Sequence, residues 1–397
     1  MKNSKITPKG FGDYLFEEST AQNEIEKRLN SLFYKKGYHP VVTPALEYLD
    51  VFTADGEVIP IERVYKLVSS DGRLLALRPD ITLPIARLAA TRLQNQTPPY
   101  RLCYTEKVFK INPHMNGRRD ECTQSGVELL GAGGKRADLE IIMTAARALS
   151  VCGATDYKIE IGHAGFFKSL IRTLGTDDET TERIRSLIEM KNYVELDELL
   201  SPMKGNRAAE TIMKLPRLFG SKDVLNEAYG LCGGIGSESL DYVGELLREL
   251  ENTDIAKHIS LDLGLVHSNN YYTGILLRGY LEGSGITVLT GGRYDDMLSH
   301  FGMDLPAIGF AVQNDEMAKL LVESKKAAVP APDIIVFAEN GFETKALYYC
   351  EKCANDGLIA ENSVFDTLGQ TKEYALRRGI NKLAVCSDTV TLTEVSK

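Results

Sequence analysis

The chain has 397 residues, of which 43% are hydrophobic and 25% are charged, as in soluble globular proteins. Its net charge of −9 argues against a surface built mainly to bind nucleic acid, and no run of about 18 apolar residues predicts a membrane-spanning helix. Seven scattered cysteines, and an N-terminus without the hydrophobic segment of a signal peptide, predict a cytoplasmic protein.

The first predicted element is a helix over residues 20–36. Ser19 and Gln22 have the spacing of a capping box, and Gly37 ends the helix. Apolar side chains recur at helical spacing and predict one apolar stripe, formed by Ala21, Ile25, Leu29, Leu32 and Phe33. The strand that follows is interrupted by Pro44, which suits a strand at an edge or an interface.

A hairpin that turns at Ser70-Asp71-Gly72 comes next, and the segment LRPDIT joins it to another predicted helix. On local grounds Asp80 or Thr82 can simply cap that helix, because both side chains can accept hydrogen bonds from free backbone N–H groups. The alternative is that both side chains also face a ligand.

The most informative stretch is residues 100–131, which we interpret as two strands joined by a polar turn. Three cations are expected around the turn: Lys110, Arg118 and Arg119. Gln124 and Glu128 are four residues apart on the returning strand and therefore point to the same face. An amide and a carboxylate overlooked by three cations suit a small zwitterion. The alternative is a solvated hairpin with ordinary surface charge.

Helix and strand patterns follow the hairpin. A helix is predicted over residues 137–152, followed by a strand that contains His163, which we interpret as a packed or capping histidine rather than a ligand. Residues 166–251 have little strand signal and predict an inserted helical subdomain. Strand signal returns at residues 271–290, and a further strand and helix complete a core that ends at residue 324.

Residues 325–332 have the composition of a linker. Residues 333–397 predict a small α/β unit with three strands. Cys350 and Cys353 form a CxxC pair in this unit, but they lie in a helical pattern with no second pair, so we expect neither zinc nor redox chemistry.

Common nucleotide and catalytic motifs are missing from the sequence. No phosphate-binding loop of the GxxxxGK(S/T) type occurs, no GxGxxG follows a strand, and no Ser–His–Asp or metal-binding cluster stands out. We therefore expect no cofactor and no metal. The residues alone predict a mostly antiparallel α/β domain with an acidic, tyrosine-rich pocket for a small molecule.

Five motifs, in this order, resemble the core of class II histidyl-tRNA synthetases: LRPDIT, GRRDECTQSGVELLG, YYTG, GGRYDDML and PAIGFAV. The resemblance covers about residues 5–322. It implies an α+β fold, in which a six- or seven-stranded antiparallel sheet is flanked by helices, followed by a truncated anticodon-binding domain. It also implies a homodimer built on the helix at residues 20–36 and the strand that contains Pro44.

The same resemblance implies a histidine-binding pocket. Positions that hold the histidine substrate in that family are matched by Thr82, Gln124, Glu128, Tyr272 and Tyr294. Asp80 stands where the family has a glutamate, and Lys110, Arg118 and Tyr271 complete the expected set. Carboxylate and amide acceptors would pair with the α-ammonium and imidazole N–H groups, and tyrosines would enclose the ring.

Three departures from the synthetase pattern affect cations that hold ATP. Lys110, His267 and Glu316 each stand where the family has an arginine. Lysine lacks the bidentate fork of arginine, histidine is mostly neutral at pH 7, and glutamate reverses the charge beside a triphosphate. Because loss of one preorganised donor costs about 3–4 kcal/mol, we expect no aminoacylation and no catalytic residues.

This profile resembles the family of ATP phosphoribosyltransferase regulatory subunits. The resemblance implies a non-catalytic subunit that a short catalytic subunit needs for activity and for feedback inhibition by L-histidine, in the first step of histidine biosynthesis. It also implies a hetero-octamer. Binding of tRNA is not expected, because residues 330–397 contain 7 Lys and Arg against 10 Asp and Glu. Two alternatives are a divergent active synthetase and another non-catalytic synthetase paralogue, which binds tRNA or a protein outside histidine synthesis.

Overall fold

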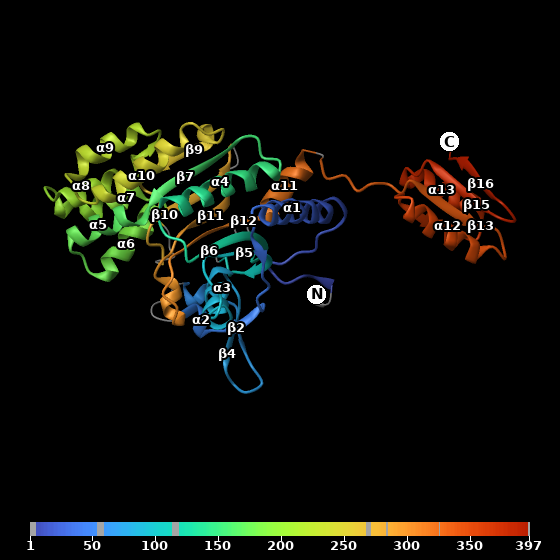
Figure 1. The fold of residues 1–397 in the computed structure, drawn as a ribbon, viewed down its shortest axis with the longest axis horizontal. Coiled ribbons are helices and arrows are strands. Elements are labelled where there is room, and N and C mark those ends of the chain that lie inside the picture. The colour runs from blue at the N-terminus through green and yellow to red at the C-terminus, as the bar shows by residue number, and fades with distance from the viewer. Residues whose placement is uncertain are drawn as a thin grey trace. The chain divides into compact units, whose positions relative to one another are not determined.

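The computed structural model describes residues 5–53, 59–112, 119–266, 271–282, 285–324 and 326–395 (Figure 1). The chain divides into two compact units, and the division falls between Ala327 and Ala328. Each unit has buried cores of its own. None of the helices in the described ranges is long and apolar enough to cross a membrane.

A large mixed sheet organises the first unit. Across the described part of this sheet the strand order is β1-β5-β6-β12-β11-β10-β7-β9-β8. In that order the strands are β1 (His39–Pro40), β5 (Tyr100–Phe109), β6 (Glu121–Leu130), β12 (Ala307–Gln313), β11 (Thr287–Arg293), β10 (Ile275–Leu281), β7 (Tyr157–His163), β9 (Ile259–Asp262) and β8 (Phe219–Gly220). Among the six strands from β5 to β7, every pair of adjacent strands is antiparallel.

These six antiparallel strands agree with the expected fold class. Further strands, β1 on one side and β9 and β8 on the other, enlarge the sheet. At one edge β1 pairs with β5 in parallel, and towards the other edge β9 pairs with β7 in parallel. Parallel neighbours require a long crossover connection. The crossover between β7 and β9 is a group of helices, so the insertion in the sequence accounts for the parallel strand in the sheet.

Three helices pack on one face of the sheet: α1 (Phe16–Lys35), α4 (Lys135–Val151) and α11 (Asn314–Glu323). α1 begins four residues before the predicted start, and because no side chain caps it, Ser19 is not the N-cap. The predicted apolar stripe of α1 lies in the core of its own chain, where Ala21, Ile25, Leu29 and Phe33 are completely buried. The stripe therefore gives no argument for a second copy of the chain.

A small antiparallel sheet is formed by three strands from the N-terminal part of the sequence. Its strand order is β2-β4-β3, with bounds Leu46–Tyr48, Leu74–Leu77 and Lys66–Val68. The predicted hairpin turn connects β3 to β4. Pro44 separates β1 from β2, so the chain leaves the large sheet and enters the small one at the proline. Two helices, α2 (Asp50–Thr53) and α3 (Thr82–Arg92), share a second core with strand β5.

The helical insertion has its own core. Its helices are α5 (Ala164–Leu174), α6 (Asp178–Glu189), α7 (Tyr193–Leu200), α8 (Arg207–Lys214), α9 (Asp223–Cys232) and α10 (Ser237–Leu250). His163 is the N-cap of α5, and its Nδ1 accepts a hydrogen bond from the Gly165 N–H at 3.1 Å. The interpretation of His163 as a capping histidine is confirmed.

The second unit is a sheet with one helix on each face. Its strand order is β14-β13-β15-β16. The elements are β13 (Ile334–Ala338), α12 (Glu343–Asn355), β14 (Ala360–Asn362), α13 (Leu368–Arg378), β15 (Lys382–Cys386) and β16 (Val390–Glu394). Two separate core clusters pack against the two faces. The prediction of three strands missed β16, which pairs with β15 in an antiparallel hairpin.

Candidate functional site

A cavity of about 640 Å³ opens over the central strands of the large sheet. This volume suits a small-molecule site. Eight of the nine residues predicted for the histidine pocket line it: Asp80, Thr82, Lys110, Gln124, Glu128, Tyr271, Tyr272 and Tyr294. The ninth, Arg118, lies outside the described residues. So does His267, which stands where the synthetase family has an arginine.

The predicted hairpin is present as β5 and β6, and it carries the most buried carboxylate of the cavity. Glu128 of β6 is only 1% exposed. Its Oε1 accepts a hydrogen bond from Thr82 Oγ1 at 2.9 Å, and its Oε2 accepts one from the hydroxyl of Tyr294. The carboxylate is therefore held from two sides by groups that are far apart in the sequence.

A glycine on the neighbouring strand makes room for this carboxylate. Gly309 of β12 is the cross-strand partner of Glu128. A Cβ atom at position 309 would lie 1.8 Å from Glu128 Oε2, which no real structure tolerates. The glycine in the PAIGFAV motif thus lets the Glu128 side chain lie flat across the sheet.

Burial sets the electrostatics of Glu128. The pKa of its carboxyl is raised to about 8, mainly because the group is removed from water and also because Asp80 is near, whereas the hydroxyl donors Tyr294 and Thr82 oppose the shift. A buried carboxyl in this state favours a proton or a cationic ligand group beside it.

Asp80 contacts the first turn of α3 and also lines the cavity. Its Oδ1 accepts a hydrogen bond from the Leu83 N–H at 3.0 Å. Burial raises the pKa of its carboxyl. Asp80 thus presents a second carboxyl to the same cavity as Glu128.

Three tyrosines form an aromatic wall. The ring centroids of Tyr271 and Tyr272 are 4.5 Å apart, and the ring of Tyr271 meets that of Tyr294 edge to face at 5.9 Å. Burial raises the pKa of both Tyr272 and Tyr294, so their hydroxyls remain protonated donors at neutral pH.

The cations expected around the hairpin turn have different surroundings. Desolvation and the nearby Arg63 lower the pKa of Lys110, and Asp80 and Glu189 oppose this shift. Arg119 also lines the cavity, but its guanidinium lies over the ring of Tyr14, 4.4 Å from the centroid. Lys110 is therefore a cation among carboxylates, and Arg119 is stacked on an aromatic ring.

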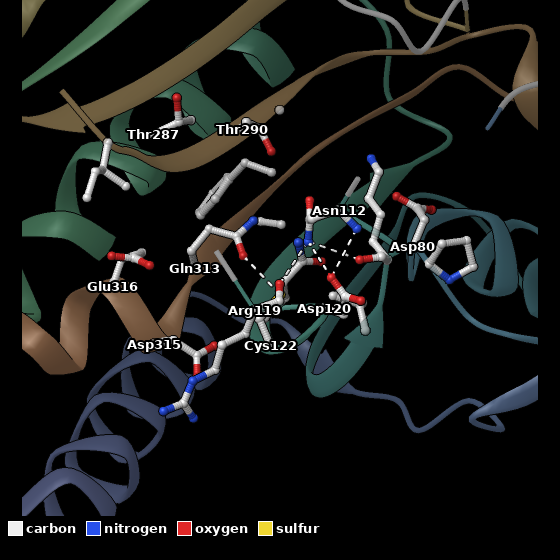
Figure 2. A pocket seen from close by; sticks show the side chains of 18 of the residues that line it. Asp80, Asn112, Arg119, Asp120, Cys122, Thr287, Thr290, Gln313, Asp315 and Glu316 are labelled. Atoms are coloured by element: carbon white, nitrogen blue, oxygen red, sulfur yellow. Dashed lines mark hydrogen bonds between the residues drawn. The ribbon is translucent and has the colours of Figure 1, made fainter. Parts of the chain in front are cut away.

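The end of the cavity near α11 is acidic. Asp315 accepts hydrogen bonds from the Tyr14 hydroxyl, from Gln22 Nε2 at 2.8 Å and from the Thr123 N–H at 2.7 Å. Glu316 pairs with Lys319 of its own helix at 2.8 Å. Figure 2 shows Asp80 and Glu316 towards opposite ends of the pocket, with Gln313 and Cys122 between them.

The charge balance of the walls decides which ligands fit. Among the described lining residues, eight are Asp or Glu and four are Lys or Arg. Such a lining repels phosphate groups, because a polyphosphate is held by surrounding positive charges. Nor does any group of described His, Cys, Asp and Glu side chains gather as a metal site requires.

The sequence analysis did not identify two residues of the cavity wall, one in the N-terminal segment and one in α1. Tyr14 and Gln22 both line the cavity through their contacts with Asp315. Gln22 is 8% exposed and lies beside the apolar stripe of α1. A polar residue on a buried helical face was a signal that could have identified it. Tyr14 carried no such signal, because it precedes the helix.

Comparison with known proteins places the chain among relatives. A family model described as histidyl-tRNA synthetase matches residues 10–317. An ATP phosphoribosyltransferase regulatory subunit from Clostridium acetobutylicum is 38% identical over 395 residues, which cover 98% of this chain and 97% of that protein.

Solved structures agree with the sequence relatives. A crystal structure described as an ATP phosphoribosyltransferase regulatory subunit/histidyl-tRNA synthetase from Bacillus halodurans superposes with a TM-score of 0.83, at 28% identity, over 96% of this chain and 98% of that one. Histidyl-tRNA synthetase from Nostoc has the same fold, with a TM-score of 0.77, at 18% identity, over 98% of this chain and 94% of that one. The chain therefore belongs to the family of ATP phosphoribosyltransferase regulatory subunits, built on the fold of a class II histidyl-tRNA synthetase.

Proposed function

We propose that this chain is a non-catalytic regulatory subunit that binds L-histidine in the 640 Å³ cavity and transmits its presence to a short ATP phosphoribosyltransferase catalytic subunit. The complex would catalyse the first step of histidine biosynthesis under feedback control. The observation that carries the proposal is the buried Glu128, held by Thr82 and Tyr294 in a cavity whose lining is predominantly acidic.

The cavity has the groups that a free histidine needs. Glu128 and Asp80 supply carboxyl oxygens for the α-ammonium and the imidazole N–H groups, and Gln124 supplies an amide from the same face of β6. The aromatic wall of Tyr271, Tyr272 and Tyr294 suits a flat ring. Lys110 is the cation that we assign to the ligand carboxylate.

The same lining argues against adenylation. That reaction gathers negative charge on a triphosphate, which needs preorganised cations. Glu316 brings a carboxylate to the cavity where a synthetase would have an arginine, and Asp315 lies beside it. Each lost donor would cost about 3–4 kcal/mol of transition-state stabilisation, and a reversed charge adds repulsion to that loss.

Assembly is the second part of the proposal. One face of the small sheet presents Leu46, Tyr48 and Leu67, which are 43%, 46% and 41% exposed. Tyr48 and Leu67 are both cross-strand partners of Leu75, so the three strands form one apolar face. Exposed faces of this kind suit protein contacts. We assign it to an isologous contact between two copies of this chain, within a hetero-octamer with the catalytic subunit.

Three measurements test the proposal. Calorimetric titration should show histidine binding to the isolated chain, and a histidine-dependent pyrophosphate exchange assay should show no turnover. Phosphoribosyl transfer by the catalytic subunit should require this chain and should fall as histidine is added. Histidine binding with normal pyrophosphate exchange would instead identify an active synthetase. A chain that never associates with the catalytic subunit would favour a different synthetase paralogue.

A further inference from the structure

A second cavity, of about 420 Å³, adjoins the candidate site. It lies between α5, α6 and the residues on either side of the start of β10. Tyr272 lines both cavities, and Lys168 of α5 donates a hydrogen bond to the Tyr272 backbone oxygen at 2.8 Å. One residue of the proposed histidine pocket is therefore shared with a cavity that the proposed function does not use.

The walls of this second cavity are largely apolar. Side chains from α5 and from the segments around β10 supply them: Phe167, Ile171, Leu265, Val266 and Leu276. Its volume lies within the range of small-molecule sites, which combine apolar walls with a few polar anchors. The body of a fitting ligand must accordingly be apolar.

Among the described residues that line the second cavity, three are Lys or Arg and two are Asp or Glu, which leaves one net positive charge. Arg185 lines it but is engaged on both sides, by Glu182 at 2.7 Å and Glu189 at 2.6 Å. Lys168 and Arg172 are four residues apart on α5 and so lie on one face of that helix. Arg172 forms no ion pair with any residue that the structure describes.

Of the two carboxylates in the described lining, Glu182 pairs with Arg185, and Asp178 at the start of α6 offsets one of the other two cations. We infer that the 420 Å³ cavity is a second ligand site, for a small molecule with an apolar body and a single anionic group, and that its occupation alters the histidine pocket through Tyr272. The binding part of this inference rests on the geometry of the second cavity alone, and the coupling part rests on the proposed function.

The chain contains no tryptophan, which gives a direct assay. Phe167→Trp places a single indole in the wall of the cavity. The probe is 4-phenylbutyrate, compared with its neutral amide and with 4-phenylbutylamine, which share the apolar body. We expect the carboxylate to change the indole fluorescence with an affinity about tenfold higher than the amide, and the amine to bind most weakly. A Tyr348→Trp chain, with its indole in the C-terminal unit, should show no change.

Charge variants identify the anchor. Arg172→Gln should reduce the affinity for the carboxylate to that for the amide, and leave the amide unaffected. The matched control is Arg183→Gln, because Arg183 of α6 is exposed, pairs with Glu195 and does not line the cavity. No binding of any probe overturns the site, and equal affinities for the three probes overturn the preference for an anion. If Phe167→Trp does not fold, saturation-transfer NMR of the native chain with the same three probes decides the same question.

Coupling is measured by titrating histidine with and without saturating 4-phenylbutyrate. We expect the histidine affinity to change at least threefold, and the probe affinity to change by the same factor when histidine is present, because coupling between two sites is reciprocal. An unchanged histidine affinity overturns the coupling through Tyr272. A native chain that binds no histidine overturns the proposed function instead, and the indole titration still decides whether the second site exists.

Discussion

Replacement of Glu128 by glutamine should separate ligand binding from folding. The change keeps the shape of the side chain and removes the charge that we assign to a cationic group of histidine. Loss of one charge-assisted hydrogen bond in a closed site costs about 1.5–3 kcal/mol, which corresponds to a roughly ten- to hundredfold weaker affinity. The cost lies at the upper end if the partner group on histidine finds no other acceptor.

The same substitution should weaken the pH dependence of the stability of the ligand-free chain. Burial raises the pKa of the Glu128 carboxyl to about 8, well above its unfolded value. Between about pH 4.5 and 8 the folded chain therefore holds a proton that the unfolded chain has lost, so this group makes the free energy of unfolding fall as pH rises through that window. Glu128→Gln has no such group and should lose less stability across the window than the native chain.

Calorimetric titration with histidine and thermal unfolding at pH 5 and pH 8 measure the two effects together. The control is Glu121→Gln on the same strand, because Glu121 pairs with Lys107 at 2.6 Å and does not line the cavity. In the reconstituted complex, Glu128→Gln should shift histidine inhibition to higher concentrations and leave activation intact. Equal histidine affinities for Glu128→Gln, Glu121→Gln and the native chain would refute the assignment of this pocket to histidine.

Further outcomes follow from other contacts. Histidine affinity should rise between pH 6.5 and 8 in the native chain, because a cationic ligand needs ionised Glu128, and should vary less in Glu128→Gln; identical titration profiles would contradict this. Gly309→Ala should weaken histidine binding about tenfold, because the new methyl group meets the Glu128 carboxylate, whereas Gly230→Ala, in open space, should not. Tyr48→Glu should convert dimers to monomers in sedimentation velocity, with Val194→Glu, 72% exposed in the insertion, as a control that stays dimeric. The chain alone should show no pyrophosphate exchange, and a turnover of about 1–10 s⁻¹ would contradict the regulatory assignment.

The sequence could predict the parts of the structure in which apolar residues recur at a regular spacing or turn residues are grouped. The hairpin of β5 and β6 followed from alternating strand residues, and that alternation also placed Gln124 and Glu128 on one face. The start of α1 was misplaced because a capping box was expected at Ser19, whereas the helix begins at Phe16 without a side-chain cap. Strand β16 was missed because four of its five residues are exposed and several are polar, so it lacks a buried alternation.

Contacts between distant segments were beyond the reach of local patterns. Tyr14 and Asp315 are 301 positions apart, yet their hydrogen bond ties the N-terminal segment to the acidic end of the cavity. The apolar stripe of α1 was visible in the sequence, but its partner was not. A helix stripe is apolar whether it packs on its own sheet or on another chain, and only the assembled fold shows which.

The parallel pairing of β7 with β9 has a consequence for the order of folding. It joins Ile159 to Ile259, one hundred positions apart. Closing an unstructured loop of that length costs about 4 kcal/mol of chain entropy. The helices between the two strands form a core of their own, to which Leu261 of β9 contributes. If this bundle condenses first from its local contacts, it brings the two strands together and removes most of that entropic barrier. During refolding, the backbone amides of the helical insertion should then become protected from hydrogen exchange first. Those of β9 and β8 should become protected later.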